Sequence, residues 1–161
     1  MAHTLSRLAK ASLGGALLLS AASSNVAAQD VIELTQTGCQ FLESENNVDL
    51  GYTPKSADDC KTINADTGDK RLGEAKVLEL APGTYTFRVS NADVPYELGF
   101  WIRESDYQLG NPVHKLTKTS VSGGGLVEGT SKDYEVDLEP GEYLYSCPLN
   151  PTPNYKIVVK G

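Results

Sequence analysis

The sequence predicts an all-β protein: a Greek-key β-sandwich of about seven or eight strands that carries one polar excursion. Segments in which apolar and polar residues alternate recur after residue 75, and few stretches show helical periodicity. Two segments, LELAPGTYTF from Leu78 and VDLEPGEYLY from Val136, each join a strand to a Tyr-bearing strand through a Pro-Gly turn. Two similar arches fit equivalent corners of two packed sheets, whereas a solenoid needs more repeats.

Residues 1–28 are predicted to be a secretory signal peptide. Two basic residues precede an apolar run over residues 11–22, and small residues lead to a cleavage point before Gln29. The apolar run is shorter than the roughly 20 residues that a membrane helix needs. We therefore expect one exported domain over residues 29–161, periplasmic or secreted, with no membrane span.

The charge of the chain limits its partners. It has 14 basic and 21 acidic side chains and a net charge of −7. Removal of residues 1–28 takes away two basic side chains and no acidic ones, which brings the net charge from −7 to −9. Such a surface repels nucleic acid and anionic lipid. We expect no nucleic-acid partner, and the sequence leaves open whether a protein or a small molecule binds.

The sequence predicts the following strands, helix and turn. The first strand lies in VIELTQTGCQF, from Val31. Residues 42–75 form a polar surface excursion with one short helix, SADDCKTIN, which Ser56 caps and Asp59 supports three residues later. The Gly-rich stretch SGGGLVEG is expected to be a break, with Gly123–Gly125 as a flexible turn. The other strands are AKVLEL, GTYTFRVSN, YELGFWIRE, KDYEVDLE, GEYLYSC and YKIVVKG.

The chain has three cysteines. In an oxidising compartment we expect a disulfide between Cys39 and Cys60, because it would pin an excursion that is too polar to hold itself against the core. Closing a loop of about 20 residues stabilises a fold by roughly 3 kcal/mol in the chain-entropy model. Three cysteines allow other pairs, so a bond from Cys147 to either of the first two is the alternative.

The run GEYLYSCPLNP, which contains Cys147, and the closing strand over residues 155–160 resemble the last hairpin of the cupredoxins, the small blue-copper proteins. In that family a strand of this form ends in a copper-ligating cysteine, a histidine follows three positions on, and a methionine comes soon after. Upstream the family has an Asn, a short turn and a ligand histidine, and the segment NADVPYELGF from Asn91 is similar. Over residues 76–160 the resemblance implies a cupredoxin-like domain.

The same resemblance implies that copper ligands are missing. Tyr96 stands in the place of the first histidine and Asn150 in that of the second, beside Cys147. A blue-copper site needs a thiolate and two imidazoles, but after residue 28 the chain has one histidine, His114, and no methionine. We therefore expect no type 1 copper centre. Instead, hydrogen bonds of Tyr96 and Asn150 are expected to bridge the two loops that copper would tie together.

Other roles for Cys147 stay open. A free cysteine among tyrosines and prolines behaves as a small, inert apolar residue. Alternatively, Cys147 and His114 would meet and hold copper or zinc with ligands from acidic side chains or from a partner. The thiol would otherwise pair with another chain or react with oxidants. The metal reading gives an alternative function, a copper or zinc carrier or an electron-transfer protein.

No enzyme activity is expected. A catalytic triad needs a nucleophile, a base and an orienting group, and His114 is the one histidine base in the expected domain. The chain has no nucleophile-elbow motif GxSxG, and its Gly-rich stretch lacks the Lys of a phosphate-binding loop.

The expected function is therefore that of an exported accessory or binding protein. By analogy with the family, its working surface is expected at the end that carries residues 91–96 and 148–155. A second alternative is a protein-interaction module built on residues 42–75. Most aromatic residues alternate along strands and are expected in the core. Trp101 is the exception, because neighbouring strand residues point to opposite faces. The candidate binding surface comprises Trp101, Pro148, Pro151, Pro153 and Tyr155.

Overall fold

The structure, a computed structural model, describes residues 30–161, so the expected signal peptide lies outside the described residues. This part of the chain contains nine strands, one 3-10 helix and two α-helices. They are β1 (Asp30–Thr37), β2 (Gln40–Phe41), η1 (Glu43–Glu45), α1 (Ala57–Glu74), β3 (Leu78–Leu80), β4 (Gly83–Asn91), β5 (Leu98–Glu104), α2 (Pro112–Thr117), β6 (Thr119–Leu126), β7 (Ser131–Leu138), β8 (Gly141–Ser146) and β9 (Tyr155–Val159).

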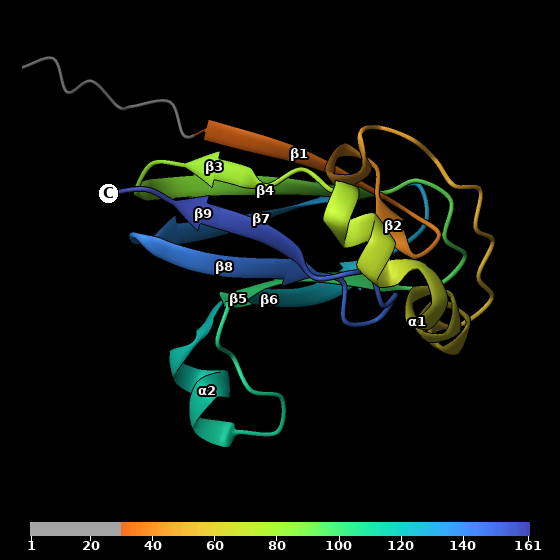
Figure 1. Cartoon of the computed structure of the whole chain (residues 1–161). Helices are drawn as coiled ribbons and strands as arrows, with labels where there is room; N and C mark the ends of the chain where they lie inside the picture. Colours follow the sequence, from red (N-terminus) through yellow and green to blue (C-terminus); the bar gives the residue numbers. More distant parts are fainter. Residues whose placement is uncertain (1–29) are drawn as a thin grey trace, which may run out of the picture.

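Two sheets pack face to face (Figure 1). The first has the strand order β2-β1-β4-β7, and the second has the order β3-β9-β8-β5-β6. Alternation along the strands turns one side chain in two toward the core, as Tyr85, Phe87 and Val89 of β4 show. The predicted Greek-key β-sandwich is confirmed, with nine strands rather than seven or eight.

Aromatic rings fill the centre of the core. Phe41 of β2 lies edge-on to three rings, those of Phe100, Tyr145 and Tyr155, with centroid distances of 5.7–6.0 Å. Phe100 also packs against Phe87 of the opposite sheet, 5.5 Å between centroids. Such pairs stabilise a core beyond the area that they bury. The expectation that most strand aromatics form the core is confirmed for Phe87, Phe100 and Tyr145.

The two Pro-Gly arches form equivalent corners between the sheets. The first leads from β3 in the second sheet to β4 in the first, and the other leads from β7 in the first sheet to β8 in the second. In each, the tyrosine after the turn donates to a carbonyl four residues back: Tyr85 Oη to Ala81 O and Tyr143 Oη to Glu139 O, both at 2.9 Å. The repeated motif therefore serves the same structural purpose twice.

The Gly-rich stretch is a strand, and the expected flexible turn at Gly123–Gly125 was wrong. These residues belong to β6, an edge strand that pairs with β5 through an irregular register. A Cβ on Gly99 would lie 2.7 Å from the carbonyl oxygen of Gly123, and a Cβ on Gly123 would lie 3.0 Å from the ring of Tyr134. Glycine is needed here because the strands and the core ring approach closely.

The helix of the excursion is longer than expected. It begins where the sequence predicts, with the backbone N–H of Ser56 donating to the Asp59 carboxylate at 3.0 Å, but it runs for 18 residues to Glu74. It has no apolar stripe. Its buried residues are Cys60, Gly68 and Arg71, which recur at helical spacing. A disulfide and an ion pair, rather than apolar packing, attach this helix to the sandwich.

Helix α2 was not predicted. The Asn111 side chain caps it by accepting from the backbone N–H of Val113 at 3.0 Å, and Pro112 occupies its first turn. It projects from the second sheet between β5 and β6 (Figure 1). Among the described residues, neither α1 nor α2 is long and apolar enough to cross a membrane.

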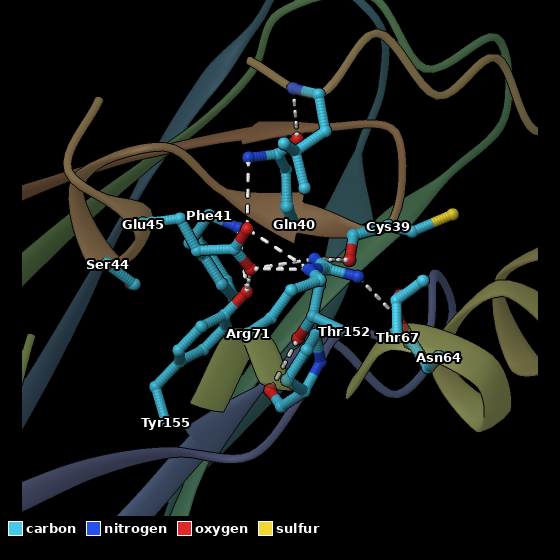
Figure 2. A network of polar contacts seen from close by, with 12 residues as sticks. Cys39, Gln40, Phe41, Ser44, Glu45, Asn64, Thr67, Arg71, Thr152 and Tyr155 are labelled. Atoms are coloured by element: carbon cyan, nitrogen blue, oxygen red, sulfur yellow. Dashed lines mark hydrogen bonds and ion pairs between the residues drawn. The ribbon is translucent and has the colours of Figure 1, made fainter. Parts of the chain in front are cut away.

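A buried ion pair joins helix α1 to η1 within the excursion, and its carboxylate also bonds to β9 of the sandwich (Figure 2). Arg71 of α1 donates to the Glu45 carboxylate from Nε at 3.0 Å and from Nη2 at 2.7 Å, and the two side chains are only 7% and 8% exposed. Arg71 Nη2 also donates to Cys39 O at 2.9 Å. Tyr155 of β9 donates its hydroxyl to the same carboxylate, and Ser44 Oγ lies 2.6 Å from Tyr145 Oη. The guanidinium of Arg71 and the hydroxyl of Tyr155 thus satisfy the buried carboxylate.

Replacing Arg71 tests this attachment. We expect Arg71→Met to lower the free energy of unfolding by about 3–5 kcal/mol, because it leaves the Glu45 carboxylate buried without its counter-charge. Urea unfolding followed by circular dichroism measures the change. The control is Lys61→Met in the exposed pair with Asp58, which should hardly move the midpoint. Equal small shifts in the two variants would mean that the buried pair does not hold the helix.

Candidate functional site

Two loops meet beside Cys147 at one end of the sandwich. Tyr96 comes from the connection between β4 and β5, and Asn150 from the connection between β8 and β9. Tyr96 Oη donates to Asn150 Oδ1 at 2.9 Å, and Asn150 Nδ2 donates to Thr37 O at 3.3 Å. Asn150 is fully buried. A hydrogen bond between Tyr96 and Asn150 thus joins the two loops.

Asn91 shapes the loop that presents Tyr96. Its Nδ2 donates to Val94 O at 3.0 Å, and its Oδ1 accepts from the backbone N–H of Val94 at 2.9 Å. The side chain is buried and completes a tight turn after β4. The short turn that the sequence indicated is therefore organised by one amide, which delivers the Tyr96 phenol to Asn150.

The Cys147 sulfur is buried and accepts two backbone hydrogen bonds. Gly99 N donates to Sγ at 3.3 Å and Asn150 N at 3.1 Å, and the N–H of Cys147 itself donates to Thr152 Oγ1 at 3.1 Å. Burial raises the pKa of the Cys147 thiol. Cys147 is the one free cysteine, so at this end of the sandwich the chain holds a neutral thiol.

The predicted disulfide between Cys39 and Cys60 is confirmed. Its Cys60 sulfur lies 2.9 Å from Asn150 Oδ1, a contact and not a hydrogen bond, because a disulfide sulfur carries no proton. Asn64, one turn further along α1, donates its amide to Pro151 O at 2.5 Å. The helix that the sequence placed on a surface excursion therefore lies against the same end of the sandwich (Figure 1).

The side chains at this end do not fit a type 1 copper ion. Burial, and after it the nearby Cys147 sulfur, raise the pKa of Tyr96 to about 12, which keeps its phenol protonated. The oxygen of Asn150 is a hard ligand that already accepts from that phenol. Within residues 30–161, no group of three or more His, Cys, Asp or Glu side chains is placed to hold a metal ion.

His114, the alternative partner of Cys147, lies on α2. Its Nδ1 accepts from the backbone N–H of Gln108 at 3.0 Å, and its ring lies 6.2 Å from that of Tyr107, centroid to centroid. In the described part of the chain, no hydrogen bond or ligand group joins His114 to Cys147. The contacts of His114 instead brace the segment between β5 and α2.

The five residues of the candidate binding surface separate into two sets. Trp101, Pro148 and Pro151 line a hollow with a volume of about 450 Å³. Pro153 and Tyr155 are buried, so their assignment to a surface was wrong. Tyr155 is 0% exposed because it opens β9 on the inward-facing side, where its ring lies 5.4 Å from that of Tyr145.

Sequence reasoning missed Arg103, which also lines this hollow. Its guanidinium lies over the Trp101 ring, 4.1 Å from the centroid, and donates to Ser146 Oγ at 3.1 Å and to Asn154 Oδ1 at 2.6 Å. The alternation in GFWIRE carried the signal. It places Trp101 and Arg103 on one face of β5 and Phe100 on the other, the core face.

Comparisons with known proteins find similar solved structures alone. Neither a family model nor a curated protein matches the chain. Reduced auracyanin from the photosynthetic bacterium Roseiflexus castenholzii is similar in structure, with a TM-score of 0.47 and 15% identity over 83% of this chain and 99% of that one. Auracyanin A, a "blue" copper protein from Chloroflexus aurantiacus, has a TM-score of 0.47 and 14% identity over 83% and 100% of the two chains. The copper protein rusticyanin has a TM-score of 0.46 and 13% identity over 83% and 80%. Similarity at this level assigns the chain no function.

The hydrogen bond between the two loops predicts a pH-dependent loss of stability. At pH 8, Tyr96→Phe should lower the free energy of unfolding by about 1 kcal/mol, the usual contribution of one hydrogen bond. The control is Tyr107→Phe, because in the described residues no hydrogen bond involves the Tyr107 hydroxyl.

The sign of the pH effect follows from the raised pKa. Folding favours the protonated Tyr96, so this contribution is complete below pH 10 and is lost as the pH rises toward 12. The difference in unfolding free energy between the parent protein and Tyr96→Phe should therefore shrink over this interval in urea titrations. A difference that stays constant or grows would mean that the phenol is not held in its neutral form.

Because the Cys147 thiol is buried, we expect it to react slowly with thiol reagents. In the native protein, Cys147 should react with a disulfide reagent at least about a hundred-fold more slowly than in urea, because the thiol is both inaccessible and protonated. Absorbance of the released reagent measures the rate, and one thiol per chain should react after unfolding. Rapid reaction of the native protein would contradict this burial.

Proposed function

We propose that this chain is an exported, non-catalytic binding protein whose cupredoxin-like sandwich works without a type 1 copper centre. The observation that carries the proposal is the 2.9 Å hydrogen bond from Tyr96 Oη to Asn150 Oδ1. These are the two positions that the resemblance assigns to histidine ligands. In this chain the side chains at the two positions form a hydrogen bond with each other. Export rests on the charge and apolar pattern of residues 1–28.

The hydrogen bonds at this end perform the structural task that a metal would otherwise have. The phenol and the amide join the loops around residues 96 and 150, and the Cys147 sulfur accepts N–H groups from both sides. Helix α1 adds a disulfide and the bond from Asn64 to Pro151 O. Because the polar groups of these loops already have hydrogen-bond partners, the loops need no metal ion to be ordered.

A binding role rather than catalysis is supported by the hollow around Trp101. Its walls are largely aromatic, aliphatic and proline side chains. The one serine at its base, Ser146, accepts hydrogen bonds from Trp101 Nε1 and Arg103 Nη1. A nucleophilic serine needs a base as its neighbour, and a tryptophan and an arginine supply none. Concave sites of this composition are typical of ligand binding.

A protein-interaction module on residues 42–75 is less favoured. This excursion is part of the folded core, because Glu45 accepts from Tyr155 of β9 and Cys60 is bonded to Cys39. Deletion of the excursion would remove these contacts and destabilise the sandwich itself. Substitutions at exposed positions of α1 such as Lys61 and Asp66 would test partner capture without that loss.

Metal analysis of the exported protein tests the proposal. We expect a chain that begins at Gln29, contains no stoichiometric copper or zinc, and develops no intense visible band on titration with Cu(I), Cu(II) or Zn(II). The reason is that Tyr96 and Asn150 supply no imidazole to Cys147. Mass spectrometry gives the first residue, elemental analysis gives the metal content, and absorption spectroscopy detects a visible band, beside a thiol count.

Two variants serve as controls. The double substitution Tyr96→His and Asn150→His brings two imidazoles to Cys147 and should acquire copper binding that its parent lacks. If the parent itself holds one metal ion per chain and loses it on Cys147→Ser, the copper-free proposal is wrong. The chain is then a metal carrier or an electron-transfer protein that uses Cys147.

A further inference from the structure

Strands β5 and β8 form the floor of the hollow on the outer face of the second sheet. Register pairs Trp101 with Ser146 and Arg103 with Leu144, so the side chains of these four residues share the face turned away from the core. Two loops form the walls. The lining residues from the loops are Tyr107, Leu109, Cys147, Pro148, Pro151, Thr152 and Asn154. The volume of about 450 Å³ is that of a small-molecule site.

Arg103 is a buried cation without a counter-charge. It is 7% exposed, and no carboxylate of residues 30–161 lies within salt-bridge distance of its guanidinium. Arg71, with the same exposure, is paired with Glu45. Burial lowers the pKa of Arg103, which reflects the cost of taking its charge out of water. An uncompensated buried charge is destabilising, and an anion in the hollow would remove that cost.

Hydrogen-bond donors are left over in this hollow. A guanidinium has five N–H groups, and the structure gives protein acceptors to two of them, on Ser146 and Asn154. Ser146 Oγ accepts from both Trp101 Nε1 and Arg103 Nη1, so its own proton is free to donate. The Trp101 ring supports the guanidinium from one side and fixes its orientation.

We propose that this hollow binds a small organic carboxylate with a flat apolar body. The carboxylate accepts from the free N–H groups of Arg103 and from the Ser146 hydroxyl, and the apolar body packs against Tyr107, Leu109 and Pro148. One buried cation compensates a monoanion fully, whereas a doubly charged phosphate would keep one buried charge without a partner. The inference rests on the binding role proposed above and names its ligand class.

The single tryptophan of the chain reports on this site directly. Titration of the exported protein with benzoate should change the fluorescence of Trp101 in a saturable way, and calorimetry should give the same affinity. Benzyl alcohol, which is neutral and of similar shape, should bind at least about ten-fold more weakly, because it forms no charge-assisted hydrogen bonds. Inorganic phosphate should also bind more weakly than benzoate.

Variants separate the cation from the rest of the surface. Arg103→Met should lose benzoate binding by at least about ten-fold in calorimetry. The control, Arg88→Met, removes an exposed arginine paired with Asp133 on the other sheet and should keep it. Circular dichroism shows whether each variant folds. If Arg103→Met does not fold, Leu109→Asp, which places a negative charge at the exposed wall, should weaken benzoate binding instead.

Three results would overturn the inference: no saturable response to benzoate below about 10 mM, equal affinity for benzyl alcohol, or undiminished binding in a folded Arg103→Met. Tighter binding of inorganic phosphate than of benzoate would overturn the assignment to carboxylates. Metal analysis of the same preparation keeps the two proposals apart. A metal-free protein that ignores benzoate contradicts only the ligand assignment, and a metal-loaded protein that binds benzoate contradicts only the copper-free one.

Discussion

The buried ion pair between Arg71 and Glu45 is the contact on which the arrangement of this protein depends. An 18-residue helix with no apolar stripe cannot pack by the hydrophobic effect, so its position must come from polar contacts. The pair supplies one anchor, and the bond between Cys39 and Cys60 supplies the other, about three helical turns away. Since Tyr155 of β9 donates to the same carboxylate, the helix and the sandwich share one network.

This anchoring reaches the end of the sandwich that carries Cys147. Between the two anchors, α1 presents Asn64 to Pro151 O, and the disulfide anchor itself lies beside Asn150. The loop after β8 is therefore held from the helix side, while the Tyr96 phenol holds it from the other loop. Buried hydrogen bonds and a disulfide therefore tie both loops to their surroundings.

The two buried arginines show how one residue type serves different ends. Arg71 faces the Glu45 carboxylate, and this ion pair holds helix α1 in place. Arg103 faces Ser146 and Asn154, which orient the guanidinium but leave its charge uncompensated beside an open hollow. The chain has a net charge of −7, so its overall charge repels anions. The guanidinium of Arg103 is a local positive charge that would favour an anion bound in the hollow.

Local chemistry in the sequence determined the sandwich, the Pro-Gly corners, the helix start at Ser56 and the pairing of Cys39 with Cys60, because each depends on neighbours in the chain or on the count of one residue type. The meeting of Tyr96 and Asn150 was expected from a motif alone. Only the tertiary structure decided the length of α1, the strand at Gly123–Gly125, the burial of Tyr155 and the hollow at Arg103. Strand alternation indicates which face each side chain takes, but which charges, glycines and rings from distant segments meet on that face follows only from the tertiary structure.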